Sequence, residues 1–157
     1  SSLPLSFVLG PRSVMDLPDI GSMSSTHSAN PMACAAGHAN LCALLEDGLL
    51  ENARDLGEVF HKELEKLRDE FPNYIRYVLG KGLLAALIFE DDEGQPLGSL
   101  CDVIAERCLQ AGLLVVHTGR ESIKLAPPLC ITEAALLEGI EVFREAIAAS
   151  VAKPQAA

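Results

Sequence analysis

The longest helical pattern in the chain lies between residues 49 and 71. Apolar side chains recur there at three- and four-residue steps, while charged side chains occupy the other positions. The apolar positions are Leu56, Phe60, Leu64 and Leu67. The pattern predicts an amphipathic helix that buries one face and ends before Pro72, and its charges are typical of a solvated face with i,i+4 pairs.

Shorter patterns lie on both sides of this helix. After it they predict strand, strand, helix, strand, strand and helix, at residues 74–79, 83–89, 99–111, 113–117, 122–125 and 132–151. Before it they predict a short buried strand, a helix of one or two turns, a loop and a helix, at residues 3–9, 12–17, 19–29 and 31–45. A small antiparallel or mixed sheet with helices on one face would bury the later elements in two layers.

The helix expected from residue 31 has a well-marked start. Asn30 is a favourable N-cap residue, and Pro31 at the first helical position loses no hydrogen bond because that N–H would be unpaired anyway. The loop before it contains the hydroxylated residues Ser25, Thr26 and Ser28. Hydroxyls and free N–H groups beside a helix start suit an anion such as phosphate. An ordinary cap explains the same residues, so the pattern alone leaves both interpretations open.

Composition narrows the class of protein. The chain has 157 residues, of which 49% are hydrophobic, so it is long enough for one domain with a buried core, or for a small domain and part of another. Its formal net charge of −10 argues against nucleic acid or an anionic membrane as a partner. No apolar run approaches the length that a membrane span requires.

Cysteines and histidines give no sign of a metal site. The five cysteines are far apart and odd in number, which favours reduced thiols in a cytosolic protein over disulfides; they are Cys34, Cys42, Cys101, Cys108 and Cys130. Neither their spacing nor the acidic residues 90–93 match a zinc or calcium motif. Three histidines have no partner that the sequence reveals and are interpreted as structural: His38, His61 and His117.

One segment resembles a known family. Residues 25–36 read Ser-Thr-His-Ser-Ala-Asn-Pro-Met-Ala-Cys-Ala-Ala. They are similar to the Ser-Thr-aromatic-Gly-Gly-Asn-Pro-Leu-Ala-Cys-Ala-Ala segment of class III pyridoxal-phosphate aminotransferases, which include the ornithine, acetylornithine and 4-aminobutyrate enzymes. Four more segments follow the family's order, at residues 3–10, 48–53, 80–83 and 123–129. The resemblance therefore runs from residue 1 to about residue 151.

This resemblance implies an α/β fold, the small C-terminal domain (α+β) of the type I pyridoxal-phosphate transferase fold, with a small sheet covered by helices. Residues 1–45 would then be a remnant of the large cofactor-binding domain, residues 46–152 the small domain and residues 153–157 a disordered tail. In the family, the lysine that forms the Schiff base precedes the segment matched by residues 3–5. We therefore expect it upstream of Ser1, so that the chain as printed contains no catalytic residue and is an inactive fragment.

The resemblance also implies site residues. Thr26 matches a threonine that reaches across the dimer interface to the cofactor phosphate of the neighbouring subunit, and Ser25 matches the residue beside it. Lys124 matches a position that is arginine in many members, where it binds the substrate α-carboxylate. Lysine offers a point charge in place of a planar two-pronged donor, so the exchange is not neutral, and Arg120 is an alternative cation. His27 replaces an aromatic residue and would line the substrate entrance or merely cover the loop.

The activity implied is transfer of an amino group from an amino acid or ω-amine to a 2-oxo acid, with pyridoxal 5′-phosphate as cofactor. The implied enzyme is a cytoplasmic homodimer whose cofactor site is shared across the interface. Two alternatives remain open. A racemase or epimerase of the same fold would share these motifs, and Lys124 is the residue that favours it. A noncatalytic binding or assembly module would need no Schiff-base lysine.

Overall fold

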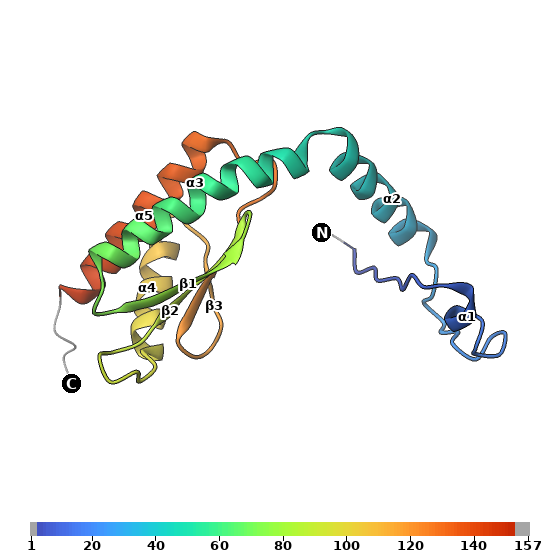
Figure 1. Ribbon diagram of the computed structural model, residues 1–157, viewed down its shortest axis with the longest axis horizontal. Coiled ribbons are helices and arrows are strands. Elements are labelled where there is room, and N and C mark those ends of the chain that lie inside the picture. The colour runs from blue at the N-terminus through green and yellow to red at the C-terminus, as the bar shows by residue number, and fades with distance from the viewer. Residues whose placement is uncertain (1–2, 153–157) are drawn as a thin grey trace. The chain divides into compact units, whose positions relative to one another are not determined.

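The computed structural model describes residues 3–152, and the tail expected at residues 153–157 lies outside the described residues. The chain forms two compact units, Ser1–Gly48 and Leu49–Ala157. In chain order the elements are α1 (Arg12–Met15), α2 (Pro31–Glu46), α3 (Leu49–Glu70), β1 (Ile75–Lys81), β2 (Leu84–Phe89), α4 (Gly98–Gln110), β3 (Val116–His117), β4 (Ser122–Leu125) and α5 (Glu133–Val151), as Figure 1 shows.

The first unit contains α1 and α2 joined by a long loop. The Oδ1 atom of Asn30 accepts hydrogen bonds from the N–H groups of Met32 and Ala33, at 3.0 and 3.2 Å, and Pro31 is the first helical residue. The predicted start of this helix is therefore confirmed. The short helix expected after residue 12 is confirmed as well, as the single turn of α1.

The buried strand predicted at residues 3–9 is wrong. These residues form no strand, and their side chains are exposed. A strand needs a neighbour to accept and donate its backbone hydrogen bonds, and residues 3–48 of the first unit contain no other strand. The apolar run instead touches α2, since Leu5 occupies the space where Gly37 would carry a Cβ atom.

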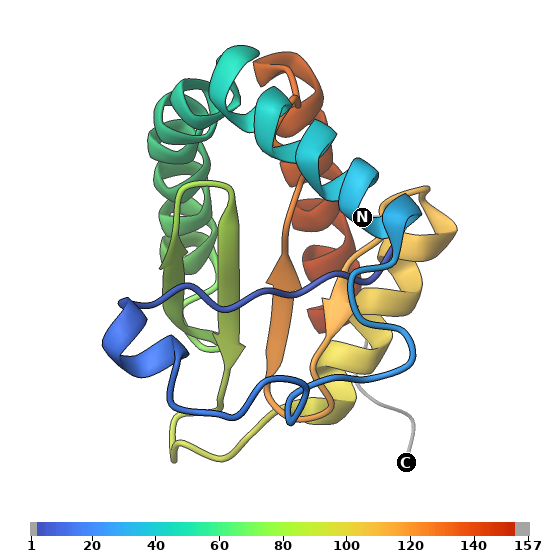
Figure 2. The ribbon, with the colours of Figure 1, turned by 90° about the vertical axis from the view of Figure 1, so that its right-hand side faces the viewer.

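The second unit is built on one antiparallel sheet with the strand order β1-β2-β4-β3 (Figure 2). The predicted strands are all present, but β3 contains only two residues where five were expected. The N–H group of Leu113 explains the difference, because it donates to the carbonyl oxygen of Cys108 at 2.8 Å. Leu113 therefore closes the end of α4, with Gly112 at φ +86°, and does not join the sheet.

The core of the second unit lies between the sheet and its helices. Helices α3 and α4 pack against the strands, and α5 packs against both of these helices. The predicted apolar face of α3 is confirmed, because Phe60, Leu64 and Leu67 are buried. Along β2 the alternation of strand side chains directs Ala85, Leu87 and Phe89 toward the core. Within residues 3–152, no helix is both long enough and apolar enough to span a membrane.

Candidate functional site

The loop that precedes α2 is held by two serines. The N–H group of Ser28 donates to the carbonyl oxygen of Ser25 at 3.0 Å, which closes a turn. The N–H group of Ser25 donates to Oγ of Ser28 at 2.9 Å, and the two hydroxyl oxygens are also 2.9 Å apart. Ala29 follows with φ +52°, a left-handed conformation that a non-glycine residue rarely adopts. These contacts fix the tip of the loop, which carries Thr26 and His27.

Thr26 presents an available donor on this loop. Its side chain is exposed, and its hydroxyl has no hydrogen-bond partner within residues 3–152. The N–H group of Ser25 is already bonded to Ser28, so Ser25 has less to offer a ligand. The first turn of α2 is satisfied too, because Cys34 donates its N–H to the carbonyl oxygen of Asn30 at 2.9 Å. An anion at this loop would therefore bind at its tip, where Thr26 lies, and not at the helix start.

Lys124 lies in the middle of β4, on the face of the sheet away from the helices. Its strand partners are Ala86 of β2 and Val116 of β3, so small and apolar side chains flank it. Lys124 is exposed, and it forms no ion pair with any residue of the described part of the chain. An unpaired ammonium group on an exposed apolar face is suited to bind a carboxylate.

Arg120 lies in the turn between β3 and β4, outside the sheet. Its Nε atom is 3.2 Å from the carboxylate of Glu121, and 78% of its side chain is exposed. Because its charge is already paired, Arg120 is a weaker candidate than Lys124 for a ligand carboxylate.

The predicted site residues thus fall into two groups. Ser25, Thr26 and His27 share one exposed loop of the first unit, and Lys124 belongs to the sheet of the second unit. Each role assigned to them stays a prediction.

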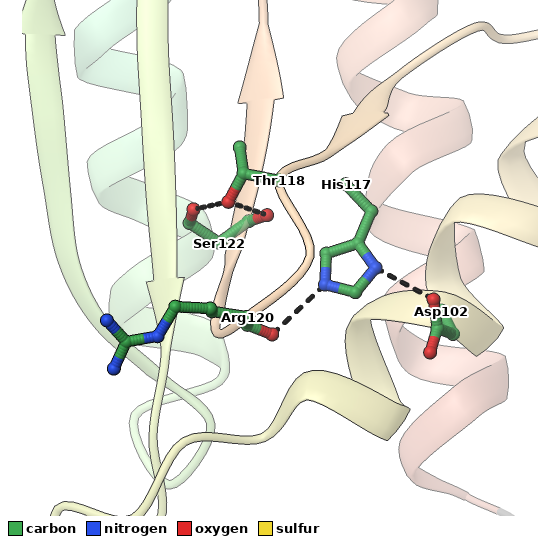
Figure 3. A network of polar contacts seen from close by, with 5 residues as sticks. All are labelled: Asp102, His117, Thr118, Arg120 and Ser122. Atoms are coloured by element: carbon green, nitrogen blue, oxygen red, sulfur yellow. Dashed lines mark hydrogen bonds and ion pairs between the residues drawn. The ribbon is translucent and has the colours of Figure 1, made fainter.

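The sequence did not reveal the polar network around His117 (Figure 3). The Nδ1 atom of this residue is 2.8 Å from Oδ1 of Asp102, and its Nε2 atom is 3.0 Å from the carbonyl oxygen of Arg120. Asp102 belongs to α4 and precedes His117 by 15 residues, so no local pattern could have indicated the pair.

The two core cysteines on α4 are unsuited to nucleophilic chemistry. Burial raises the pKa of the Cys101 thiol to about 12 and that of the Cys108 thiol to about 11, because the low-polarity core disfavours the thiolate. Both stay protonated at neutral pH. Among the residues that the structure describes, no three histidine, cysteine or carboxylate side chains are grouped as metal ligands.

Comparison with known proteins identifies the family. The pattern of the class III aminotransferases matches residues 1–147, and the chain belongs to this family. It is 35% identical over 147 residues to an ornithine aminotransferase of Emericella nidulans, a match that covers 92% of the chain and 31% of the relative. It is 34% identical over 137 residues to an acetylornithine aminotransferase of Synechocystis sp., covering 87% of the chain and 31% of the relative.

Solved structures agree with the sequence comparison. The acetylornithine aminotransferase of Elizabethkingia anophelis has a TM-score of 0.80 and 35% identity, covering 90% of this chain and 36% of that one. An aminotransferase of Vibrio fluvialis, described as a PMP-bound form, has a TM-score of 0.72 and 30% identity, covering 78% and 28%. The α/β type I fold expected from the resemblance is thereby confirmed. The chain spans about a third of the length of the relatives it matches.

Proposed function

We propose that the protein is a pyridoxal-phosphate-dependent class III aminotransferase, which moves an amino group from an amino acid or ω-amine to a 2-oxo acid. The observation that carries the proposal is the family match over residues 1–147, together with relatives named ornithine and acetylornithine aminotransferase at about one third identity. These named relatives are aminotransferases, which favours this activity over a racemase or a noncatalytic module.

The described residues fit the phosphate of the cofactor at one point. The hydroxyl of Thr26 would donate to a phosphate oxygen of the bound cofactor, and such charge-assisted hydrogen bonds are stronger than neutral ones. Ser25 and Ser28 hold the loop so that this hydroxyl stays at its tip. When bound, pyridoxal phosphate supplies the electron sink of the reaction. The PMP-bound state of the Vibrio fluvialis relative supports this choice of cofactor.

The substrate is held by groups of the chain itself. Lys124 attracts a substrate carboxylate with its unpaired charge, and its strand partners Ala86 and Val116 carry no charge that would compete for it. His27, at the tip of the same loop as Thr26, lines the substrate entrance.

The proposal includes a homodimer in the cytoplasm. In class III aminotransferases, the threonine that Thr26 matches reaches the cofactor phosphate of the neighbouring subunit. The exposure of this loop is consistent with a contact between subunits. The free state of the five cysteines is consistent with a reducing compartment.

The exchange Thr26→Ala should weaken cofactor binding about tenfold to a hundredfold, since a hydrogen bond to a charged group contributes about 1.5–3 kcal/mol. The dissociation constant of pyridoxal phosphate is measured by absorbance titration, in the product of the complete gene. Thr26→Ser keeps the hydroxyl and serves as the matched control, with affinity near that of the wild type. Equal affinity in all three proteins would remove Thr26 from the phosphate site.

The exchange Lys124→Met should raise the KM for a carboxylate substrate about tenfold or more, because it removes the charge and keeps the length of the side chain. Lys124→Arg, which restores a cation, should keep the KM within a few-fold of the wild type. Steady-state kinetics with one amino acid donor compare the three proteins. An unchanged KM in Lys124→Met would show that the substrate carboxylate binds elsewhere.

The reaction itself is tested by product analysis. The complete gene product is incubated with a chiral amino acid, with and without a 2-oxo acid. An aminotransferase forms a new amino acid only when the 2-oxo acid is present. Inversion of the donor without it would identify a racemase, and no change in either mixture would support a noncatalytic module.

A further inference from the structure

His117 joins two elements of the second unit that are otherwise separate in the chain. It is the last residue of β3, and its ring lies between α4 on one side and the turn of residues 118–121 on the other (Figure 3). Nδ1 contacts Oδ1 of Asp102 in α4 at 2.8 Å, and Nε2 contacts the carbonyl oxygen of Arg120 in the turn at 3.0 Å. Only 14% of the histidine side chain is exposed, whereas the side chain of Asp102 is 74% exposed, so water reaches the carboxylate but little of the ring.

Both partners of the ring are acceptors. A carboxylate oxygen and a carbonyl oxygen carry no proton to donate, so each contact needs an N–H group on the ring. A neutral imidazole has one N–H and one bare nitrogen, and it can satisfy only one of the two contacts. The protonated ring carries two N–H groups and satisfies both. The geometry therefore selects the imidazolium form.

The charged groups around His117 either favour its protonated form or are paired with other charges. Asp102 is the charged group of α4 that faces the ring, and the neighbouring thiol of Cys101 stays neutral because burial raises its pKa to about 12. In the turn, the guanidinium group of Arg120 points away from His117 and is paired with Glu121 (Figure 3). Lys124 is on the opposite face of the sheet, because His117 pairs with Ile123 and Val116 pairs with Lys124. The carbonyl oxygen of Arg120 and then Asp102 raise the pKa of His117.

The turn also meets the first residue of α4. A Cβ atom added to Gly98 would lie 2.7 Å from the carbonyl oxygen of Arg120, so the backbone of the helix start and that of the turn are in close contact. The carbonyl oxygen that His117 binds is thus part of the packing between α4 and the turn. Two further backbone hydrogen bonds involve the turn: Thr118 donates its N–H to the carbonyl oxygen of Ser122 at 3.0 Å, and Phe89 of β2 donates its N–H to the carbonyl oxygen of Glu121 at 2.6 Å.

We propose that His117 is a proton-operated latch, which holds the turn of residues 118–121 against the start of α4 while its ring is protonated and releases the turn when the ring loses its proton. This inference goes beyond the proposed function and does not depend on it. Its pH dependence has a definite sign. Since folding raises the pKa of His117, the stabilisation is complete below the ordinary value of about 6.5 and is lost as the pH rises through the pKa of the folded state.

The latch is tested in the 157-residue chain by NMR. The ring nitrogens of the four histidines are titrated, and the resonance that disappears in His117→Gln is assigned to His117. It should titrate above about 6.5, and Asp102→Asn, which keeps an acceptor but removes the charge, should lower its pKa. Asp102 is 74% exposed, so this variant should retain the fold.

Amide hydrogen exchange then reports the release of the turn. After correction for the intrinsic pH dependence of exchange, the protection of the Phe89 N–H, which donates to the carbonyl oxygen of Glu121 in the turn, should fall about tenfold as the pH passes the pKa of His117. The fall should be absent in His117→Gln and present in His27→Gln, which changes an exposed histidine of the other unit. A Phe89 protection factor independent of pH in the wild type, or a fall that persists in His117→Gln, would overturn the latch.

Discussion

Phe143→Ala is expected to lower the free energy of unfolding of the second unit by about 3–5 kcal/mol, the range for removing a buried aromatic ring from a core. Phe143 lies on α5 and is fully buried in the cluster between the helices and the sheet. The neighbouring atoms can collapse only in part into the space of the ring. The lost contacts and the remaining cavity both contribute to the destabilisation.

A surface hollow beside Phe143 further limits how far the neighbouring atoms can close the space that the ring would leave. Phe143 lines a largely apolar hollow of about 240 Å³, together with Phe60 and the segment of residues 125–128. Loss of the ring would extend the hollow into the core and bring water to apolar side chains. Water there would find few polar partners.

Urea unfolding followed by tyrosine fluorescence measures the effect. The chain has no tryptophan, and its tyrosines, Tyr74 and Tyr77, both belong to the second unit and report on it selectively. Leu137→Ala is the matched control on the same helix, where a side chain 39% exposed should contribute about 1 kcal/mol or less. A Phe143→Ala variant as stable as this control would contradict the assigned core.

Gly80→Ala should destabilise the same unit by about 2–4 kcal/mol, because strain in the backbone and a steric collision add up. Gly80 lies on β1 opposite Ala85 and has φ +130°, a value that side-chain-bearing residues rarely adopt. A Cβ atom there would collide with the carbonyl oxygen of Leu84 and lie 2.8 Å from Cα of Ala85. Both of these atoms belong to the backbone of the paired strand, so relief requires the hairpin itself to deform.

Gly112→Ala separates the two causes. Gly112 also has a positive φ, +86°, but a Cβ atom there would meet nothing within 4 Å. Gly112→Ala should lower the free energy of unfolding by about 1–2 kcal/mol, which is the contribution of backbone strain alone. The same urea experiment compares the two variants. An equal loss of stability in both would show that the collision at Gly80 is relieved without cost.

The sequence predicted those elements whose pattern is set by local chemistry. Asn30 followed by Pro31 marks a helix start in any context, and the four-residue recurrence of Phe60 and Leu64 defines a face that only a helix would bury. The segment of residues 3–9 has an equally clear apolar pattern, yet it forms no strand. Apolar character predicts burial, but a strand also depends on a partner that local sequence does not specify.

The candidate site also combines residues that local motifs indicate with contacts that depend on the fold. Thr26 and Lys124 were predicted from the resemblance to class III motifs; the family is shown, and the roles of these two residues stay predictions. The sequence could not predict the hydrogen bond from the N–H group of Ser25 to Ser28, because this bond depends on the conformation of the turn. The contacts of His117 depend on how α4 packs beside β3, and a histidine and an aspartate 15 residues apart form no recognisable pattern.

The short strand β3 has a consequence for self-association. Exposed strand edges can template the addition of another chain, and long edges do so most readily. With only Val116 and His117 in β3, this edge of the sheet offers too few backbone groups to seed a cross-chain ladder. The other edge, β1, is seven residues long but carries the exposed cations Arg76 and Lys81. Growth of the sheet into fibrils is therefore disfavoured at both edges: β3 is too short, and the cations on β1 repel those of another copy.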